Sequence, residues 1–139
     1  MKKRKLTIAL ALTLLLLITL VLLDYGNYLG KRPFKNLKAD SIEFATVFAI
    51  PPNKTATISD REALLKLAEI LNRVTIYQQY DFGREYDGQL VRFTLHMKDG
   101  TILEIGAYNP SLVINLTYYK TKYKPCQELN AFGNKFIKK

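Results

Sequence analysis

The side chains that most often carry catalysis are scarce in this chain, which holds one histidine and one cysteine in 139 residues. A histidine can act as a general base or bind a metal, and His96 is the only candidate. It lies on the face of its segment opposite Val91, Phe93 and Leu95, and no Cys, His or acidic residue stands near it at metal-ligand spacing. A lone histidine in this setting is typical of surface or cross-strand packing, so we assign it no catalytic role.

The single cysteine, Cys126, could be a reactive thiol if a helix N-terminus and the neighbouring Lys122 and Lys124 lowered its pKa. Its spacing with Leu129 and Phe132 instead places it on one face of a helix, as is typical of a small core residue. We therefore expect Cys126 in the core. One cysteine also excludes an internal disulfide.

Acidic residues, which could bind a cation or transfer a proton, gather in one loop. They are Asp81, Glu85 and Asp87, with Asp99 in a separate turn. Their spacing does not fit the fixed frame of a calcium-binding EF-hand loop. Glu43 and Glu104 would form a carboxylate pair only if their segments adjoin. Since the chain also lacks a phosphate-binding loop, a dinucleotide fingerprint and a nucleophile elbow, we predict no catalytic, cofactor or metal site and no enzyme activity.

Cations and tyrosines are concentrated near the C-terminus, where six lysines accompany a single acid, Glu128. Lysine with tyrosine suits phospholipid headgroups, acidic wall polymers or an acidic peptide. Alternating lysines would share one face if the strand before them continues, which is also typical of an edge strand that lysine protects from aggregation. Both interpretations stay open. The predicted binding edge consists of Tyr118, Lys120, Lys122, Tyr123 and Lys124.

The elements that would position such a site begin with an N-terminal membrane segment. Four cations precede Leu6–Leu23, a run of apolar residues and threonines without charge. At about 1.5 Å per residue, a helix of this length nearly spans a hydrocarbon core of about 30 Å. A cleaved signal peptide would need a small-residue site soon after the run, and the candidates that end at Gly26 and Gly30 do not provide one. We predict an uncleaved signal anchor at residues 1–23, with residues 6–23 in the cell membrane.

The charges on either side of this run bear on its orientation. The positive-inside count is nearly tied, but the N-terminal cations abut the apolar run directly, and a long C-terminal domain translocates largely regardless of its charge. We predict a single-pass protein with its C-terminal domain extracytoplasmic. The part after Leu23 has a net charge of about +5, against +9 for the whole chain. This excess favours anionic neighbours in the envelope, and the location argues against nucleic acid.

The segment that follows the membrane run predicts a linker and then a domain. Residues 24–40 carry scattered glycine, proline and cations without a sustained period, as is typical of a juxtamembrane linker. The domain is expected at residues 41–139. Ile42–Ile50 alternates with a period of two and predicts a strand, which Pro51-Pro52 ends.

A helix and a strand are predicted next. Ser59-Asp60-Arg61-Glu62 is a capping box with Ser59 as the N-cap of a helix that runs to about Arg73. Thr75–Tyr80 predicts a further strand, and a polar loop follows from Asp81 to Gly88.

The clearest hairpin is Gln89–Tyr108, with Asp99-Gly100 at its turn. A two-residue turn would pair Leu95 with Glu104, which opposes apolar and charged side chains. A three-residue loop with Gly100 in the left-handed conformation opposes apolar side chains on one face instead, and we choose it. This register pairs Met97 with Thr101, Leu95 with Leu103 and Phe93 with Ile105.

The remaining elements complete the fold class. After Asn109-Pro110, one strand is predicted from the alternation that runs from Leu112 to Tyr118. Pro125 suits the first turn of a short final helix, and Gly133 suits its end. Together these elements predict an α+β domain with an antiparallel sheet of about four to five strands. One main helix packs on one face, a short C-terminal helix closes the domain, and a single transmembrane helix precedes it.

Three short motifs carry a resemblance to a known family. They are Ser59-Asp60-Arg61-Glu62, Lys98-Asp99-Gly100-Thr101, and Tyr123-Lys124-Pro125-Cys126-Gln127-Glu128-Leu129-Asn130. Over about residues 40–136 the chain resembles small, uncharacterised, membrane-anchored extracytoplasmic proteins of Gram-positive bacteria. It is also similar to modules appended to the extracytoplasmic end of membrane sensors related to antirepressor metallopeptidases. The resemblance implies a regulatory or interaction module and carries over no functional residue.

We therefore predict a membrane-anchored extracytoplasmic interaction or regulatory module of unknown ligand. It would contact anionic envelope components or a partner protein through the predicted binding edge. One alternative is an immunity-type protein that shields its host from a toxin or an antimicrobial peptide. A further alternative is an envelope hydrolase that uses His96 or Cys126.

Overall fold

The protein forms two compact units, Met1–Gly30 and Lys31–Lys139, in a computed structural model that describes residues 2–79, 88–108 and 111–138. The first unit is helix α1, Lys2–Leu29. Its stretch Arg4–Leu23 is long and apolar enough to cross a membrane, and its leucine side chains are exposed. The helix thus extends six residues beyond Leu23, and the second unit begins at Lys31 rather than after a free linker.

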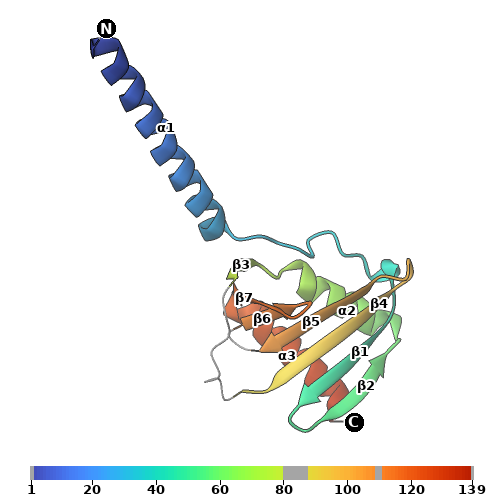
Figure 1. The fold of residues 1–139 in the computed structure, drawn as a ribbon. Helices are drawn as coiled ribbons and strands as arrows, with labels where there is room; N and C mark the ends of the chain where they lie inside the picture. Colours follow the sequence, from blue (N-terminus) through green and yellow to red (C-terminus); the bar gives the residue numbers. More distant parts are fainter. Residues whose placement is uncertain (1, 80–87, 109–110, 139) are drawn as a thin grey trace. The chain divides into compact units, whose positions relative to one another are not determined.

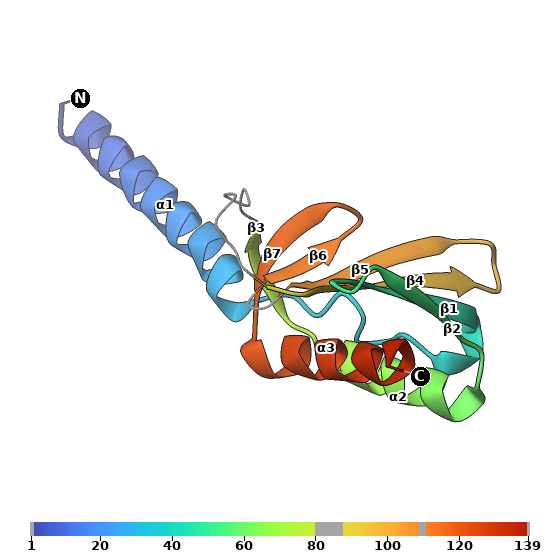
Figure 2. The same ribbon diagram turned by 90° about the horizontal axis from the view of Figure 1, so that it is seen from below.

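The second unit contains an antiparallel sheet with two helices on one face (Figure 1). Among the described residues the strands are β1 Ile42–Ile50, β2 Lys54–Ile58, β3 Ile76–Gln79, β4 Leu90–Met97, β5 Ile102–Tyr108, β6 Ser111–Ile114 and β7 Thr117–Thr121. Their order across the sheet is β2-β1-β4-β5-β6-β7-β3. The helices are α2, Arg61–Asn72, and α3, Tyr123–Ile137, with a 3-10 turn η1 at Ala39–Ser41. Figure 2 shows α2 and α3 in one layer and the strands in the other.

The α+β class was predicted, but the expected sheet of four to five strands was wrong, because the described part of the chain already contributes seven strands to the sheet. One missed strand is β2. Pro51-Pro52 ends β1 as expected, but the chain then reverses, with Asn53 at a φ of 63° and its N–H donating to the Ala49 carbonyl at 2.8 Å. Residues 54–58 return beside β1 as a hairpin partner.

The second discrepancy lies in the predicted strand from Leu112 to Tyr118, which is two strands, β6 and β7. Asn115 and Leu116 form the turn between them, with φ angles of 45° and 68°. Positive φ at both central residues is typical of a type I′ hairpin turn, in which Asn is common but a branched residue such as Leu is not. The Asn115 side chain accepts from the Glu104 N–H at 3.1 Å, which ties the turn to β5.

The predicted register of the β4–β5 hairpin is confirmed. Leu95 pairs with Leu103 and Phe93 pairs with Ile105. Gly100 has a φ of 85°, and its N–H donates to the Met97 carbonyl at 2.9 Å. The strand predicted at Ile42–Ile50 is also confirmed as β1, with the same bounds.

The start of α2 differs by one residue from the predicted capping box. Asp60, not Ser59, is the N-cap, and its Oδ2 accepts from the Ala63 N–H at 2.9 Å. A carboxylate at this position also favours the positive end of the helix dipole.

The predicted end of the last helix at Gly133 was wrong, because α3 continues to Ile137. Gly133 lies where α3 crosses the sheet, and a Cβ on it would be 2.4 Å from Val91 Cγ1. The glycine therefore allows close approach of helix and sheet rather than ending the helix. The fully buried side chains on this face of the sheet are Ala45, Val47, Ala49, Val91, Phe93, Leu95, Ile105, Ala107 and Leu112.

The part of the second unit that precedes β1 packs against the rest of that unit. Lys31 and Ile76 exchange two backbone hydrogen bonds, at 2.7 and 2.8 Å. Phe34 is buried, and Arg32 donates from Nε to the Asn72 carbonyl at 3.2 Å. These contacts place residues from Lys31 onward in the folded domain.

Candidate interaction site

The residues of the predicted binding edge do not form one edge in the structure. Strand β7 lies inside the sheet, between β6 and β3, so Lys120 is on an interior strand. Tyr118 and Lys120 lie on the sheet face opposite the helices. Their neighbour Tyr119 pairs with the buried Leu112 on the face that the helices cover, and successive residues of a strand alternate between the two faces. Lys122 is the N-cap residue of α3, and Tyr123 and Lys124 begin that helix. The strand therefore ends before the three lysines can share a face.

His96 lies on the open face of the sheet, which is the face opposite α2 and α3. Its ring stacks on Phe44 of the neighbouring strand, with centroids 4.2 Å apart and planes 14° from parallel. Such a stack is the contact expected of a cross-strand packing residue.

Cys126 is fully buried, as the sequence predicted for a core residue. Its Sγ donates a hydrogen bond to the Ser111 carbonyl at 3.3 Å. Burial raises the pKa of the Cys126 thiol to about 11. Because the thiolate is the reactive form, this environment makes the thiol inert.

We expect the Cys126 thiol to react with a disulfide reagent at pH 8 more than about 100-fold slower in the native protein than in the unfolded chain. The reason is that both thiolate fraction and access are reduced by burial. Labelling with and without guanidinium chloride measures the ratio, and rapid labelling of the native protein would contradict the buried placement.

The acidic candidates are separated or fall outside the described residues. Glu43 and Glu104 lie on β1 and β5, which β4 separates, so they do not form a pair. The loop with Asp81, Glu85 and Asp87 lies outside the described residues. In the rest of the chain, no three His, Cys, Asp or Glu residues are grouped as a metal site.

A concave surface lies between the two helices. We call it the α2–α3 groove, and it has a volume of about 400 Å³. Its apolar part is built from Ile70 and Phe132, both mostly buried, with Ala131 beside them. The lining residues are Lys66, Ile70, Arg73, Glu128, Ala131, Phe132 and Lys135.

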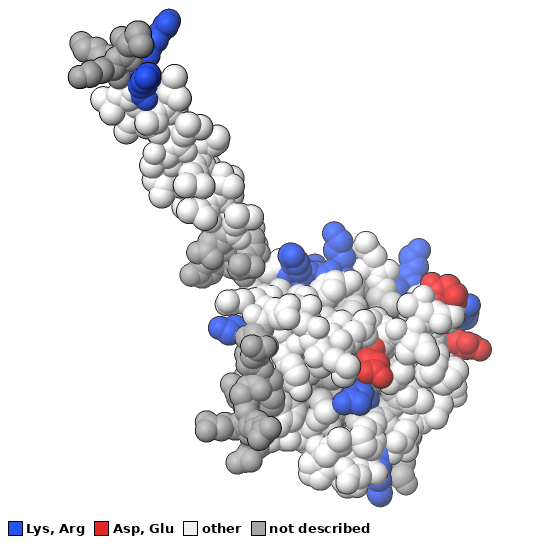
Figure 3. Space-filling view, in the orientation of Figure 1, with Lys and Arg blue, Asp and Glu red and all other residues white. Residues whose placement is uncertain are grey.

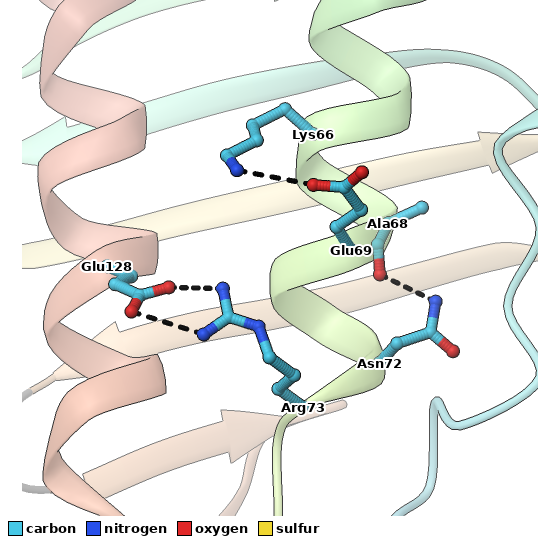
Figure 4. Close-up of polar contacts among 6 residues, drawn as sticks. All are labelled: Lys66, Ala68, Glu69, Asn72, Arg73 and Glu128. Atoms are coloured by element: carbon cyan, nitrogen blue, oxygen red, sulfur yellow. Dashed lines mark hydrogen bonds and ion pairs between the residues drawn. The ribbon is translucent and has the colours of Figure 1, made fainter.

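An ion pair joins the two helices across this groove (Figure 4). The Arg73 guanidinium donates two hydrogen bonds to Glu128, one of them from Nη1 to Oε1 at 3.2 Å. These bonds lower the pKa of Glu128, and the nearby charges of Lys124 and Lys66 act in the same direction. Glu128 in turn raises the pKa of Arg73. Both groups are therefore charged at neutral pH.

Cations exceed acids around the groove. Lys66 pairs with Glu69 of the same helix at 3.2 Å, as Figure 4 shows. Lys124 and Lys135, in contrast, form no ion pair with any residue that the structure describes. Three cations and one acid thus line the groove, and the charge of Lys124 also acts on that acid, Glu128, so the groove has an apolar floor with a basic rim.

Sequence reasoning missed this groove because it depends on two helices that lie side by side. The sequence of each helix nevertheless shows part of the charge pattern. Lys66 and Arg73 are seven residues apart, which puts them on one side of α2 two turns apart. On α3, Glu128 and Lys135 are also seven residues apart, and Lys124 lies four residues before Glu128, so all three share one side of that helix. Nothing in either helix alone indicates that these sides meet.

The open face of the sheet offers a smaller hollow. It lies over Gly106 and is lined by Arg92, Glu104 and Tyr118, with a volume of about 60 Å³. Small-molecule pockets are typically about 300–1,000 Å³, so this hollow is too small for one. Figure 3 shows that few charged side chains lie on this face. Of these two concave surfaces, the α2–α3 groove is therefore the stronger candidate.

Comparison with known proteins adds no family to this description. No family model matches the chain, and neither a curated protein nor a solved structure matches it.

Proposed function

We propose that the protein is a single-pass membrane protein whose extracytoplasmic domain binds an acidic segment of a partner protein through the α2–α3 groove. The observation that carries this proposal is the combination of an apolar floor and a basic rim in one groove of about 400 Å³. Helix α1, long and apolar enough to cross a membrane, supports the anchor. The resemblance to membrane-anchored extracytoplasmic proteins favours the same location.

The two chemical parts of the groove select different features of a ligand. Lys124 and Lys135 are exposed and can attract carboxylates without first breaking an ion pair. Ile70 and Phe132 form an apolar floor that a polyanion such as a wall polymer would leave unused. A peptide with acidic and apolar residues at helical spacing satisfies both parts, as in other helix-in-groove recognition.

The Arg73–Glu128 pair gives the groove a further way to recognise a carboxylate. Both side chains are partly exposed, at 45% and 30%. Ion pairs near the surface contribute only about 0.2–1 kcal/mol. A ligand carboxylate can therefore replace Glu128 at the guanidinium with little loss of stability, and Arg73 can bind it with two hydrogen bonds.

The proposal can be tested with a short synthetic peptide whose Glu and Leu residues are spaced to lie on one side of a helix. The full chain in detergent micelles is expected to bind it, and added salt is expected to weaken binding. The variant Lys124→Glu/Lys135→Glu should bind at least about tenfold more weakly, because rim attraction becomes repulsion. Fluorescence anisotropy of the labelled peptide measures the affinity.

A matched variant, Lys98→Glu/Lys120→Glu, makes the same charge change at two exposed lysines outside the groove. It should retain binding. If it loses as much affinity as the groove variant, the net charge alone is responsible and the groove assignment fails. A second peptide with Ser in place of Leu should bind poorly. Equal binding of that peptide would show that the apolar floor is not used and that the ligand is a simple polyanion.

A further inference from the structure

The two edge strands of the sheet, β2 and β3, differ in whether another segment pairs with their outer side. Edge strand β3 pairs on one side with β7, and on its other side Lys31 caps the start of the strand through two backbone hydrogen bonds to Ile76. Edge strand β2 pairs only with β1 among the strands that the structure describes (Figure 1). An uncovered edge presents backbone N–H and C=O groups to which another strand can pair.

Apart from a lysine at one end, strand β2 lacks the usual features that prevent such pairing. Between Lys54 and Ile58 it contains no proline, and its register with β1 is continuous. Thr55 and Thr57 are exposed, and both are β-branched residues that favour strands. Its single charged residue, Lys54, stands at one end.

We propose that β2 pairs with β2 of a second copy of this chain, in an antiparallel arrangement centred on Ala56. This register opposes Thr55 of one copy to Thr57 of the other. It opposes Lys54 to Ile58, so the like charges of the two copies never face each other. Threonine pairs stabilise a sheet, and directly opposed like charges destabilise it.

The strand is therefore complementary to itself, which is the property that a twofold interface requires. Pairing in this manner joins the two seven-stranded sheets into one continuous sheet. It also places the helix layers of both copies on the same side, because opposed residues in a strand pair share a face. The two α2–α3 grooves then lie on one side of the dimer.

Disulfide cross-linking of the full chain in lipid vesicles tests the pairing and its register. A mixture of the Thr55→Cys and Thr57→Cys variants brings opposed cysteines together, within the reach of a disulfide. The Thr55→Cys variant alone places its two cysteines diagonally, about 7–8 Å apart, where a disulfide forms poorly. The cross-linked yield should be at least about fivefold higher for the mixture. Both threonines are exposed, so the substitutions leave folding intact, and the buried Cys126 does not compete.

A pair of charge variants provides the independent measurement. Thr55→Glu/Thr57→Glu opposes like charges across the proposed interface, whereas Thr55→Lys/Thr57→Glu opposes unlike charges at the same two positions. Only the second should retain a dimer when two differently tagged copies are co-purified. Equal yields for the cysteine mixture and for Thr55→Cys alone would overturn the proposal, since they indicate random collision. Equal behaviour of the two charge variants would also overturn it, and would leave the β2 edge to a strand of a different protein.

Discussion

Replacing Gly133 with alanine is expected to destabilise the domain by about 1–3 kcal/mol, although alanine favours a helix. The added Cβ would lie 2.4 Å from Val91 Cγ1, and 3.0 Å from both Phe93 Cζ and Val47 Cγ2. All three neighbours are fully buried, and two of them are β-branched with restricted rotamers. Alanine gains about 1 kcal/mol in helix propensity over glycine. The overpacking exceeds this gain because neither α3 nor the sheet can shift without disturbing the core between them.

Urea unfolding measures this effect, followed by tyrosine fluorescence because the chain contains nine tyrosines and no tryptophan. Gly88→Ala is the matched control, since a Cβ there meets no atom within 4 Å. It should change stability by less than about 0.5 kcal/mol. The double variant Val91→Ala/Gly133→Ala should lose less stability than the sum of the two single variants, because the smaller side chain makes room for the Cβ. A Gly133→Ala variant as stable as the original protein would contradict the close approach of α3.

The sequence permitted prediction where neighbouring segments alone determine the structure. The β4–β5 register follows from the apolar residues of one short hairpin and from the glycine at its turn, so only one pairing buries Phe93 against Ile105. The bounds of β1 follow in the same way from alternation and Pro51. Such information is contained within about twenty residues of chain.

Features that depend on distant contacts were not predictable in this way. Gly133 near the end of a helical pattern is typical of a C-terminal stop, and only the sheet beneath it explains a glycine inside α3. Leu116 continues an apolar alternation, but it occupies a turn position with a φ of 68° and is 75% exposed. The alternation therefore predicted one strand where the chain reverses.

The candidate site was also predictable only in part: its residue types could be predicted, but its location could not. The excess of lysine near the C-terminus was evident in the sequence, and so was its suitability for an acidic ligand. Its location was not, because Lys124 and Lys135 form a rim only when α3 lies beside Lys66 and Arg73 of α2. The open edge of β2 was likewise inaccessible to prediction, since β2 itself was missed.

Placing charge in the middle of α1 is expected to abolish the proposed membrane anchoring. Leu14 and Leu17 lie near the centre of the stretch Arg4–Leu23, and both side chains are exposed in the structure. An arginine at the centre of a membrane helix costs about 2.5–3.5 kcal/mol, so Leu14→Arg/Leu17→Arg adds about 5–7 kcal/mol to insertion. The protein should move from the membrane pellet to the supernatant after alkaline carbonate extraction of cells.

The control Leu14→Ala/Leu17→Ala shortens the same side chains without adding charge, and it should remain in the pellet. Because Leu14 and Leu17 belong to the first compact unit, neither variant alters the core of Lys31–Lys139, and the buried Cys126 can report that this core stays folded. Intact mass then separates an anchor from a signal peptide: an anchored protein retains residues 1–30, whereas a secreted one begins near residue 27 or 31. If the arginine variant stays in the pellet with a folded domain, membrane association does not depend on α1. Because alkaline carbonate releases proteins that are held at a membrane by charge, the basic groove would not account for that result, and the assignment of α1 as the anchor would be wrong.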